Sequence, residues 1–230
     1  MIALVLLMQA ADLQVAAASD LASVRVVLAA AFEKETGDKV RFTLGSSGLL
    51  AKQIEHGAPF DVFLSANERY VMDLAKSGRV VKASVRTYAT GTLGLWSLSG
   101  KFRKLEDLVG ATHIAIANPL HAPYGVAAKE VLEKHDLWTP LRKKIVYGEN
   151  VRQALQYAES GNADAVLTAW PLLLDKPGAV AIPASAHRAI RQAGGVVAGS
   201  RESAMAERFV RFLTDGRGAE ILRSAGFGKP

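Results

Sequence analysis

At four places in this chain an apolar run gives way to a helical pattern, and a hydroxyl or amide residue stands at each junction. These junctions are Ser19-Asp20, Ser46-Ser47, Tyr124-Gly125 and Asn150-Val151. The first amide groups of a helix have no partner within the helix, and the peptide dipoles place a partial positive charge there. A negatively charged ligand can therefore accept hydrogen bonds from such a helix start. Ordinary helix capping explains any single junction equally well.

The four junctions taken together predict a site for a small tetrahedral oxyanion. The loops at the carboxyl ends of parallel strands line the ligand crevice of an open α/β sheet. If two junctions come from each of two facing lobes, their helix starts converge on one point. Neutral donors suit this task, because each hydrogen bond to a charged group contributes about 1.5 to 3 kcal/mol without burying a second charge.

The elements that would position these junctions alternate between apolar strands and amphipathic helices. The predicted strands cover residues 13–18, 40–44, 61–65, 88–97, 113–117, 145–147, 164–168, 180–183 and 195–198. Alternation of this kind is typical of parallel sheets with helices on both faces. We therefore expect two α/β lobes joined by two crossing strands. Residues 12–87 and 195–230 would form lobe I, and residues 88–194 would form lobe II.

Composition excludes several classes of function. The net charge of +6 over 230 residues comes from dispersed basic side chains, and no basic run predicts a nucleic-acid partner. The chain has no cysteine, which excludes disulfides, thiolate metal sites and cysteine nucleophiles. The five histidines lack metal-ligand spacing, and no nucleophile elbow or P-loop is present. We therefore expect neither an enzyme nor a metal site.

The N-terminal residues 1–11 form a short apolar run that ends in small residues. The run is too short to span a bilayer and is similar to the end of a signal peptide, although it lacks the usual basic segment. The alternative is a first buried strand. A signal-peptide remnant predicts an exported protein.

Several segments resemble the periplasmic molybdate-binding proteins of ABC importers. These segments are Val15–Asp20, Gly45–Gly48, Gly57–Ala66, Asn118-Pro119, Ala122–Gly125, Ala128–Glu130, Glu149–Arg152 and Ala225–Phe227. The resemblance runs in the same order over about residues 13 to 227. It implies the type II periplasmic-binding-protein fold, in which two α/β lobes are joined by two hinge strands and enclose a ligand cleft.

The resemblance also implies a function and a set of ligand-binding residues. Such a protein captures molybdate or tungstate in the periplasm as a monomer and delivers it to a membrane permease and its ATPase. It has no cofactor, and hydrogen bonds hold the oxyanion without metal-coordinating side chains. Ser19 and Ser47 would donate from lobe I, and the backbone amides of Tyr124 and Val151 would donate from lobe II.

One part of the expected site departs from the family pattern. Many members have a tyrosine at the end of the strand where this chain reads Val166-Leu-Thr-Ala-Trp170. Ser46, Thr168 and Trp170 are therefore additional candidates, and the Tyr124 hydroxyl is another. We expect Asp20 to face solvent or to cap its own helix, because an inward carboxylate would repel a dianion.

The resemblance leaves alternatives open. The ligand could be sulfate, phosphate or another oxyanion, and the same fold also serves sensor domains and enzymes.

Overall fold

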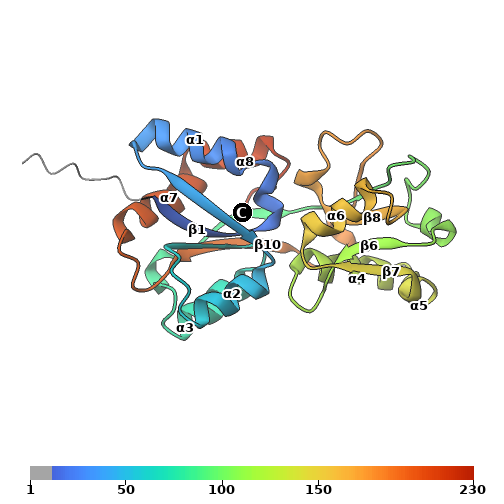
Figure 1. Cartoon of the computed structure of the whole chain (residues 1–230), viewed down its shortest axis with the longest axis horizontal. Helices are drawn as coiled ribbons and strands as arrows, with labels where there is room; N and C mark the ends of the chain where they lie inside the picture. The colour runs from blue at the N-terminus through green and yellow to red at the C-terminus, as the bar shows by residue number, and fades with distance from the viewer. Residues whose placement is uncertain (1–11) are drawn as a thin grey trace, which may run out of the picture.

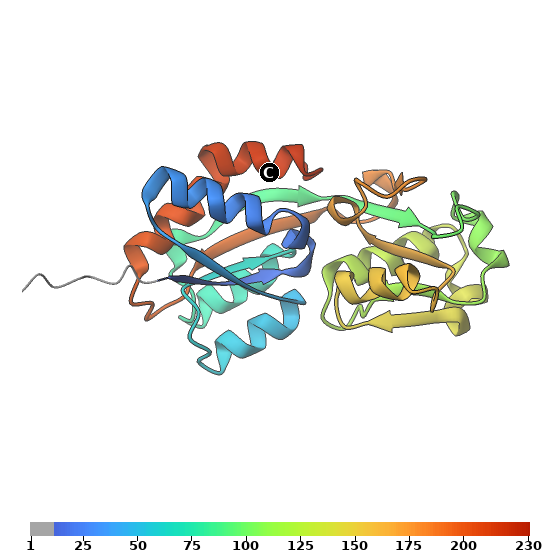
Figure 2. The same cartoon turned by 45° about the horizontal axis from the view of Figure 1, so that its top comes forward.

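The computed structural model describes residues 12–230, so the predicted signal-peptide segment lies outside the described residues. Two α/β lobes lie side by side along the long axis of the molecule, each built on a five-stranded sheet (Figure 1 and Figure 2). Within residues 12–230, no helix has the length and apolar character needed to cross a membrane. The predicted two-lobed α/β fold is confirmed.

The sheet of lobe I has the strand order β2-β1-β3-β10-β4. Its strands are β1 (Leu13–Ala18), β2 (Val40–Gly45), β3 (Val62–Ser65), β4 (Arg86–Gly91) and β10 (Ile190–Val196). β1 pairs in parallel with β2 and β3, whereas β10 pairs antiparallel with β3 and β4. The carboxyl ends of the three parallel strands consequently meet at one edge of the sheet.

Two layers of helices cover the sheet of lobe I. Its helices are the 3₁₀ turns η1 (Ser19–Ser23) and η2 (Lys82–Ser84), then α1 (Arg25–Thr36), α2 (Ser47–Glu55), α3 (Glu68–Lys76), α7 (Ser203–Asp215) and α8 (Arg217–Ser224). On one face, Phe32 of α1 packs edge-to-face against Phe209 and Phe212 of α7, at centroid distances of 5.0 and 5.4 Å. On the other face, α2 and α3 bury Leu50 and Val71. Burial of these apolar side chains is the main force that fixes the sheet edge in place.

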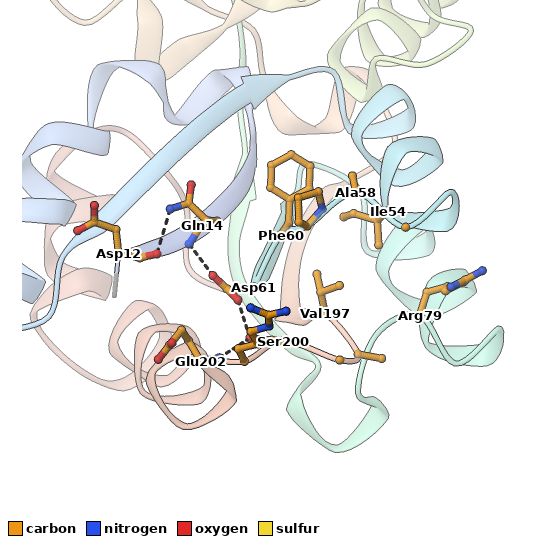
Figure 3. A pocket seen from close by; sticks show the side chains of 15 residues that line it. Asp12, Gln14, Ile54, Ala58, Phe60, Asp61, Arg79, Val197, Ser200 and Glu202 are labelled. Atoms are coloured by element: carbon orange, nitrogen blue, oxygen red, sulfur yellow. Dashed lines mark hydrogen bonds between the residues drawn. The ribbon is translucent and has the colours of Figure 1, made fainter. Parts of the chain in front are cut away.

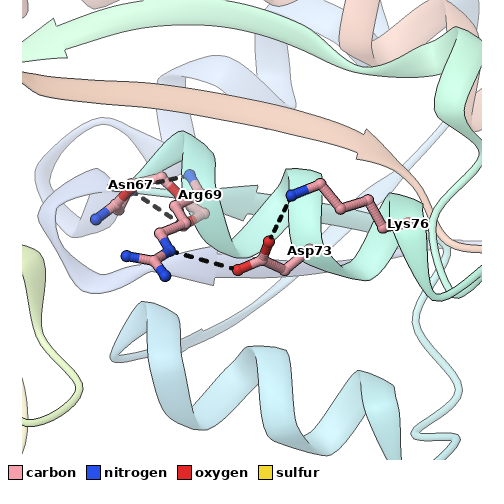
Figure 4. Close-up of polar contacts among 5 residues, drawn as sticks. Asn67, Arg69, Asp73 and Lys76 are labelled. Atoms are coloured by element: carbon pink, nitrogen blue, oxygen red, sulfur yellow. Dashed lines mark hydrogen bonds and ion pairs between the residues drawn. The ribbon is translucent and has the colours of Figure 1, made fainter.

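Asn67 begins α3 as an N-cap, as its position before an amphipathic pattern predicts. Its side-chain oxygen accepts a hydrogen bond from the Arg69 amide at 2.9 Å (Figure 4). One turn later, Asp73 lies 3.6 Å from the Arg69 guanidinium and 3.2 Å from the Lys76 ammonium. These exposed ion pairs contribute little, so the cap is the main local determinant of where α3 starts.

The sheet of lobe II has the strand order β7-β6-β8-β5-β9. Its strands are β5 (Leu93–Trp96), β6 (Ile114–Ala117), β7 (Ile145–Gly148), β8 (Ala165–Ala169) and β9 (Val180–Ala181). Its helices are η3 (Glu106–Gly110), α4 (Pro123–Lys134), α5 (Trp138–Leu141), η4 (Arg142–Lys144), α6 (Val151–Glu159), η5 (Trp170–Leu172) and η6 (Ala184–Ala186). β6 is parallel to β7 and β8, so this lobe also presents a row of strand carboxyl ends.

The connections between the lobes differ in detail from the prediction. The single strand expected over residues 88–97 is broken at Thr92 into β4 and β5, which belong to different sheets. The return strand begins at Ile190 and not at Gly195. The prediction missed the first half of this strand because the buried Gln192 interrupts its apolar pattern. The predicted lobe boundaries therefore fall within β4 and β10, which pair with each other in lobe I.

Candidate anion-binding site

All four predicted junctions line one small cavity between the lobes. The cavity has a volume of about 10 Å³, and its wall includes Ser19, Ser47, Tyr124 and Val151. These four residues are 1–5% exposed. Ser46 also lines the cavity, whereas Thr168 and Trp170 do not. The four principal residues predicted from the sequence are thus adjacent, and their role as ligands remains a prediction.

Lobe I contributes side-chain hydroxyl groups at two helix starts. Ser19 is the first residue of η1, directly after β1, and Ser47 is the first residue of α2, directly after β2. The Ser47 hydroxyl oxygen accepts a hydrogen bond from the Ala66 amide at 3.0 Å. Because that oxygen already accepts, the hydroxyl hydrogen remains suited to donation. Ser47 can therefore still donate a hydrogen bond at the cavity wall.

Lobe II contributes backbone groups at two helix starts. Pro123 is the first residue of α4 and is followed by Tyr124, while Val151 is the first residue of α6. Asn150 caps α6, because its side-chain oxygen accepts from the amides of Arg152 at 3.0 Å and Gln153 at 3.2 Å. Helix geometry leaves the amides of Tyr124 and Val151 without an internal partner. They are the backbone donors available to a ligand.

Thr168 supports the lobe II wall but does not line the cavity. Its fully buried hydroxyl donates to the Val151 carbonyl oxygen at 3.0 Å. The side chain therefore fixes the first residue of α6 and does not reach the cavity. The prediction that Thr168 could join the ligand shell is not supported by this position.

Close packing of glycine holds the backbone wall of lobe II in place. A Cβ atom on Gly125 would lie 2.0 Å from the Ala117 carbonyl oxygen, and one on Gly148 would lie 2.5 Å from the Ala154 nitrogen. Any larger residue would force α4 away from β6, or β7 away from α6. The two helix starts reach the cavity because these two positions lack a side chain.

Asp20 differs from the prediction, since it neither faces solvent nor caps its helix. The residue is 1% exposed, lines the cavity, and η1 has no side-chain cap. One carboxyl oxygen accepts from the Gln192 side-chain amide at 2.5 Å. Gln192 is 0% exposed and reaches Asp20 from β10. Sequence reasoning missed Gln192, for which a polar residue amid the apolar residues of β10 is the only signal.

The Tyr124 hydroxyl belongs to the same buried cluster. Gln192 donates to it at 3.0 Å from the same amide nitrogen that binds Asp20. Burial, followed by the neighbouring Asp20, raises the pKa of Tyr124 well above its ordinary value, so the phenol is neutral. A Cβ atom on Gly91 would lie 2.4 Å from this hydroxyl, so the tyrosine fits only against a glycine. This hydroxyl, one of the candidates for completing the ligand shell, accepts its hydrogen bond from Gln192 of β10.

His121 joins the two lobes at the rim of the cavity. Its carbonyl oxygen accepts from the Gly48 amide in α2 at 2.9 Å, and its ring Nδ1 lies 2.9 Å from the Ser46 hydroxyl. A Cβ atom on Gly48 would lie 3.0 Å from the His121 backbone. Ser46 is therefore engaged in the contact between the lobes, whereas Ser47 is directed to the cavity.

Comparison with known proteins identifies the family. The sequence matches the bacterial extracellular solute-binding protein family over residues 13–228. The chain belongs to this family. It is similar to the molybdate-binding protein ModA of Azotobacter vinelandii, with 34% identity covering 96% of this chain and 91% of the relative. It is also similar to ModA of Rhodobacter capsulatus, with 35% identity covering 87% and 81%.

A solved structure extends the similarity to three dimensions. The periplasmic molybdate-binding protein of A. vinelandii superposes with a TM-score of 0.88 at 32% identity, covering 95% of this chain and 99% of that one. The type II binding-protein fold is thereby shown for this solute-binding protein. The family and these relatives are binding proteins, so the chain is a binding protein and not an enzyme.

Trp170 of this solute-binding protein lies behind the cavity and not in its wall. η5, which begins with Trp170, contacts η1, and the indole ring packs close to Gly226 near the C-terminus. Ala169, the last residue of β8, is fully buried and does not line the cavity either.

A larger hollow of about 670 Å³ lies on lobe I at the amino ends of β1 and β3 (Figure 3). Asp61 lies in its wall. Its carboxylate accepts hydrogen bonds from the Gln14 backbone amide at 2.8 Å and from the Ser200 hydroxyl at 2.7 Å. The carboxylates of Asp12, Asp61 and Glu202 line it against the two guanidinium groups of Arg79 and Arg201. This excess of negative charge disfavours an anion, so the small cavity between the lobes is the better anion site.

Proposed function

We propose that this solute-binding protein captures molybdate or tungstate in the periplasm and delivers it to the permease and ATPase of an ABC importer. The names of the A. vinelandii and R. capsulatus relatives support this ligand, and the fold of the A. vinelandii structure supports the transport role. The protein would act as a monomer, because the two lobes of one chain supply all the donors. It would need no cofactor, because the anion oxygens need only hydrogen-bond donors.

The observation that carries the proposal is the donor set of the cavity. Two serine hydroxyls of lobe I and two helix-start amides of lobe II line the same cavity. Among residues 12–230, no lysine or arginine lines it. A dianion in such a site is stabilised by several charge-assisted hydrogen bonds and by the positive ends of the helices. Cavity size and donor placement would then select an anion with four outward oxygens.

Both lobes contribute donors, so only the closed conformation completes the shell around the anion. An anion that binds the closed form better shifts the population toward it. Closure would bend the two connections at Thr92 and at residues 187–189, where the chain passes between the sheets. The contacts of His121 with Ser46 and Gly48 would form at the same step.

Calorimetric titration with molybdate, tungstate, sulfate and phosphate tests the proposal. We expect one molybdate or tungstate to bind per chain, with sulfate and phosphate much weaker. Heat with sulfate or phosphate and none with molybdate would assign a different oxyanion to the same site. No binding of any of the four anions would contradict the proposed function.

A further inference from the structure

Asp20 places an ionisable group in the wall of the proposed oxyanion site. Its side chain is 1% exposed and lines the cavity beside Ser19. One carboxyl oxygen accepts from Gln192, and the other, Oδ1, has no hydrogen-bond partner among the described residues. A buried carboxyl oxygen without a partner is costly as a charged group and calls for either a proton or a ligand.

The elements packed against η1 bring no cation to this carboxyl group. α1 contributes Arg25, whose guanidinium binds the Ala22 carbonyl, and α6 contributes Arg152, which is exposed. β2 contributes Arg41, which pairs with Asp12 at the far end of the sheet. η5 contains only tryptophan, proline and leucine. Within the described part of the chain, a charged Asp20 would therefore have hydrogen-bond donors nearby but no cation to pair with.

The remaining neighbours of Asp20 are neutral. Tyr124 of α4 and Tyr88 of β4 are both buried, and burial raises the pKa of each phenol well above its ordinary value. Gln192 of β10 carries no charge. A dianion in this cavity would consequently meet an ionised Asp20 across a poorly screened space, and the two would repel strongly.

Building on the proposed function, we infer that Asp20 holds the oxyanion as a neutral carboxylic acid, so that one proton enters the cavity with each dianion. The proton comes from water and resides on the carboxyl group, which then donates to an anion oxygen. No covalent bond to the anion is made or broken. This arrangement converts the one repulsive side chain of the wall into a further donor.

The electrostatics of the cavity wall agree with this inference. Burial raises the pKa of Asp20 to about 6, although the hydrogen bond from Gln192 and the nearby Tyr124 hydroxyl and backbone amides of Asp20 and Leu21 oppose part of the increase. A bound dianion would raise the pKa further, since it disfavours the carboxylate. Between the ligand-free and ligand-bound pKa values, binding takes up a proton and the affinity falls by up to about tenfold per pH unit as the pH rises.

Calorimetry on the intact protein tests this linkage directly. Molybdate is titrated at about pH 6.5, 7.5 and 8.5, each in two buffers that differ in ionisation enthalpy. We expect Kd to increase about tenfold per pH unit, and the difference in heat between the buffers to approach one proton taken up per anion. A Kd and a heat that are independent of pH and buffer would overturn the inference alone. Absence of binding at every pH would overturn the proposed function as well.

A parallel titration with phosphate tests the alternative that the proton belongs to the anion and not to Asp20. Hydrogen phosphate carries its own proton and could donate a hydrogen bond to an ionised Asp20. Phosphate that binds more tightly than molybdate, without proton uptake, would therefore overturn the inference.

The Asp20→Asn variant locates the proton. Its amide can still donate but does not titrate, so we expect the pH dependence to disappear and the affinity at about pH 8.5 to exceed that of the wild type. Asp61→Asn is the matched control, because it alters a largely buried carboxyl group of the same lobe at the opposite end of the sheet. That variant should retain the wild-type pH dependence. Retention of the dependence in Asp20→Asn would contradict the assignment, and the wild-type buffer experiment decides the question even if the variant fails to fold.

Discussion

The two walls of the cavity offer hydrogen-bond donors in different ways. Lobe I presents side chains, namely the hydroxyls of Ser19 and Ser47 and the carboxyl group of Asp20. Lobe II presents the backbone at Tyr124 and Val151, and the polar side chains there serve other purposes. The Tyr124 hydroxyl binds Gln192, and Asn150 caps α6.

This difference determines how each wall can be altered. A donor of lobe I is removed by deleting one side chain, and the backbone that carries it stays in place. A donor of lobe II cannot be deleted, so it is lost only when its helix start moves. Mutations in lobe I should therefore change affinity more than stability, whereas mutations in lobe II should change both.

The largest effect is expected for Gly125→Ala in lobe II. Its Cβ atom would lie 2.0 Å from the Ala117 carbonyl oxygen, so α4 must shift away from β6 and carry the Tyr124 amide with it. We expect a loss of up to about 3 kcal/mol in stability and about 100-fold in molybdate affinity. Thermal unfolding and calorimetry measure the two quantities. Gly110→Ala in the same lobe is the control, since its Cβ atom would approach nothing closer than 4.0 Å. Equal behaviour of the two variants would show that the close packing of α4 is unimportant.

The effect of Ser47→Ala in lobe I should be similar on affinity but smaller in total, because most of the stability is kept. The variant loses a hydroxyl donor to a charged ligand, which corresponds to roughly 1.5 to 3 kcal/mol, or about 10- to 150-fold in Kd. Ser84→Ala is the matched control. The Ser84 hydroxyl also accepts a hydrogen bond from a backbone amide, that of Val196, at 2.8 Å, but Ser84 lies outside the cavity. Both variants should lose similar stability, and only Ser47→Ala should lose affinity. Unchanged binding by Ser47→Ala would remove this residue from the site.

The smallest effect is expected for Asn150→Ala, which acts on the Val151 amide only through the helix cap. Loss of an N-cap costs about 1 kcal/mol, and fraying at the start of α6 should weaken binding by about fivefold. Asn67→Ala removes the equivalent cap of α3, which lies outside the cavity. Melting temperatures should fall similarly in both variants. If Asn67→Ala weakened binding as much as Asn150→Ala, the effect would be one of general stability and not of the cavity wall.

Much of the fold follows from local patterns in the sequence. Apolar runs such as Leu13–Ala18, followed by helical spacing, were sufficient to predict the parallel strands and the four helix starts. The pairing of Ser19 with Ser47, and of Tyr124 with Val151, also follows, because parallel strands place their carboxyl ends at one edge of each sheet. The choice of these four as ligands came from the family resemblance. These features depend on residues that are near one another in the chain.

The errors concern features that depend on distant residues. Asp20 points inward because Gln192, which lies 172 positions away in the chain, supplies its hydrogen bond, and because lobe II covers it. Thr168 faces the Val151 carbonyl and not the cavity, which the alternation of a fully buried strand cannot reveal. The break at Thr92 reflects a change of sheet, and the sequence of residues 88–97 can be read as one strand with Gly91 and Gly94 inside it.

The most direct test of the account is the crystal structure of the molybdate complex, with the metal located by its anomalous scattering. We expect a single strong peak between the lobes, with oxygen atoms about 2.7 to 3.2 Å from the hydroxyls of Ser19 and Ser47 and from the amide nitrogens of Tyr124 and Val151. A peak in the hollow beside Asp61, or one between the lobes that contacts only one wall, would contradict the account.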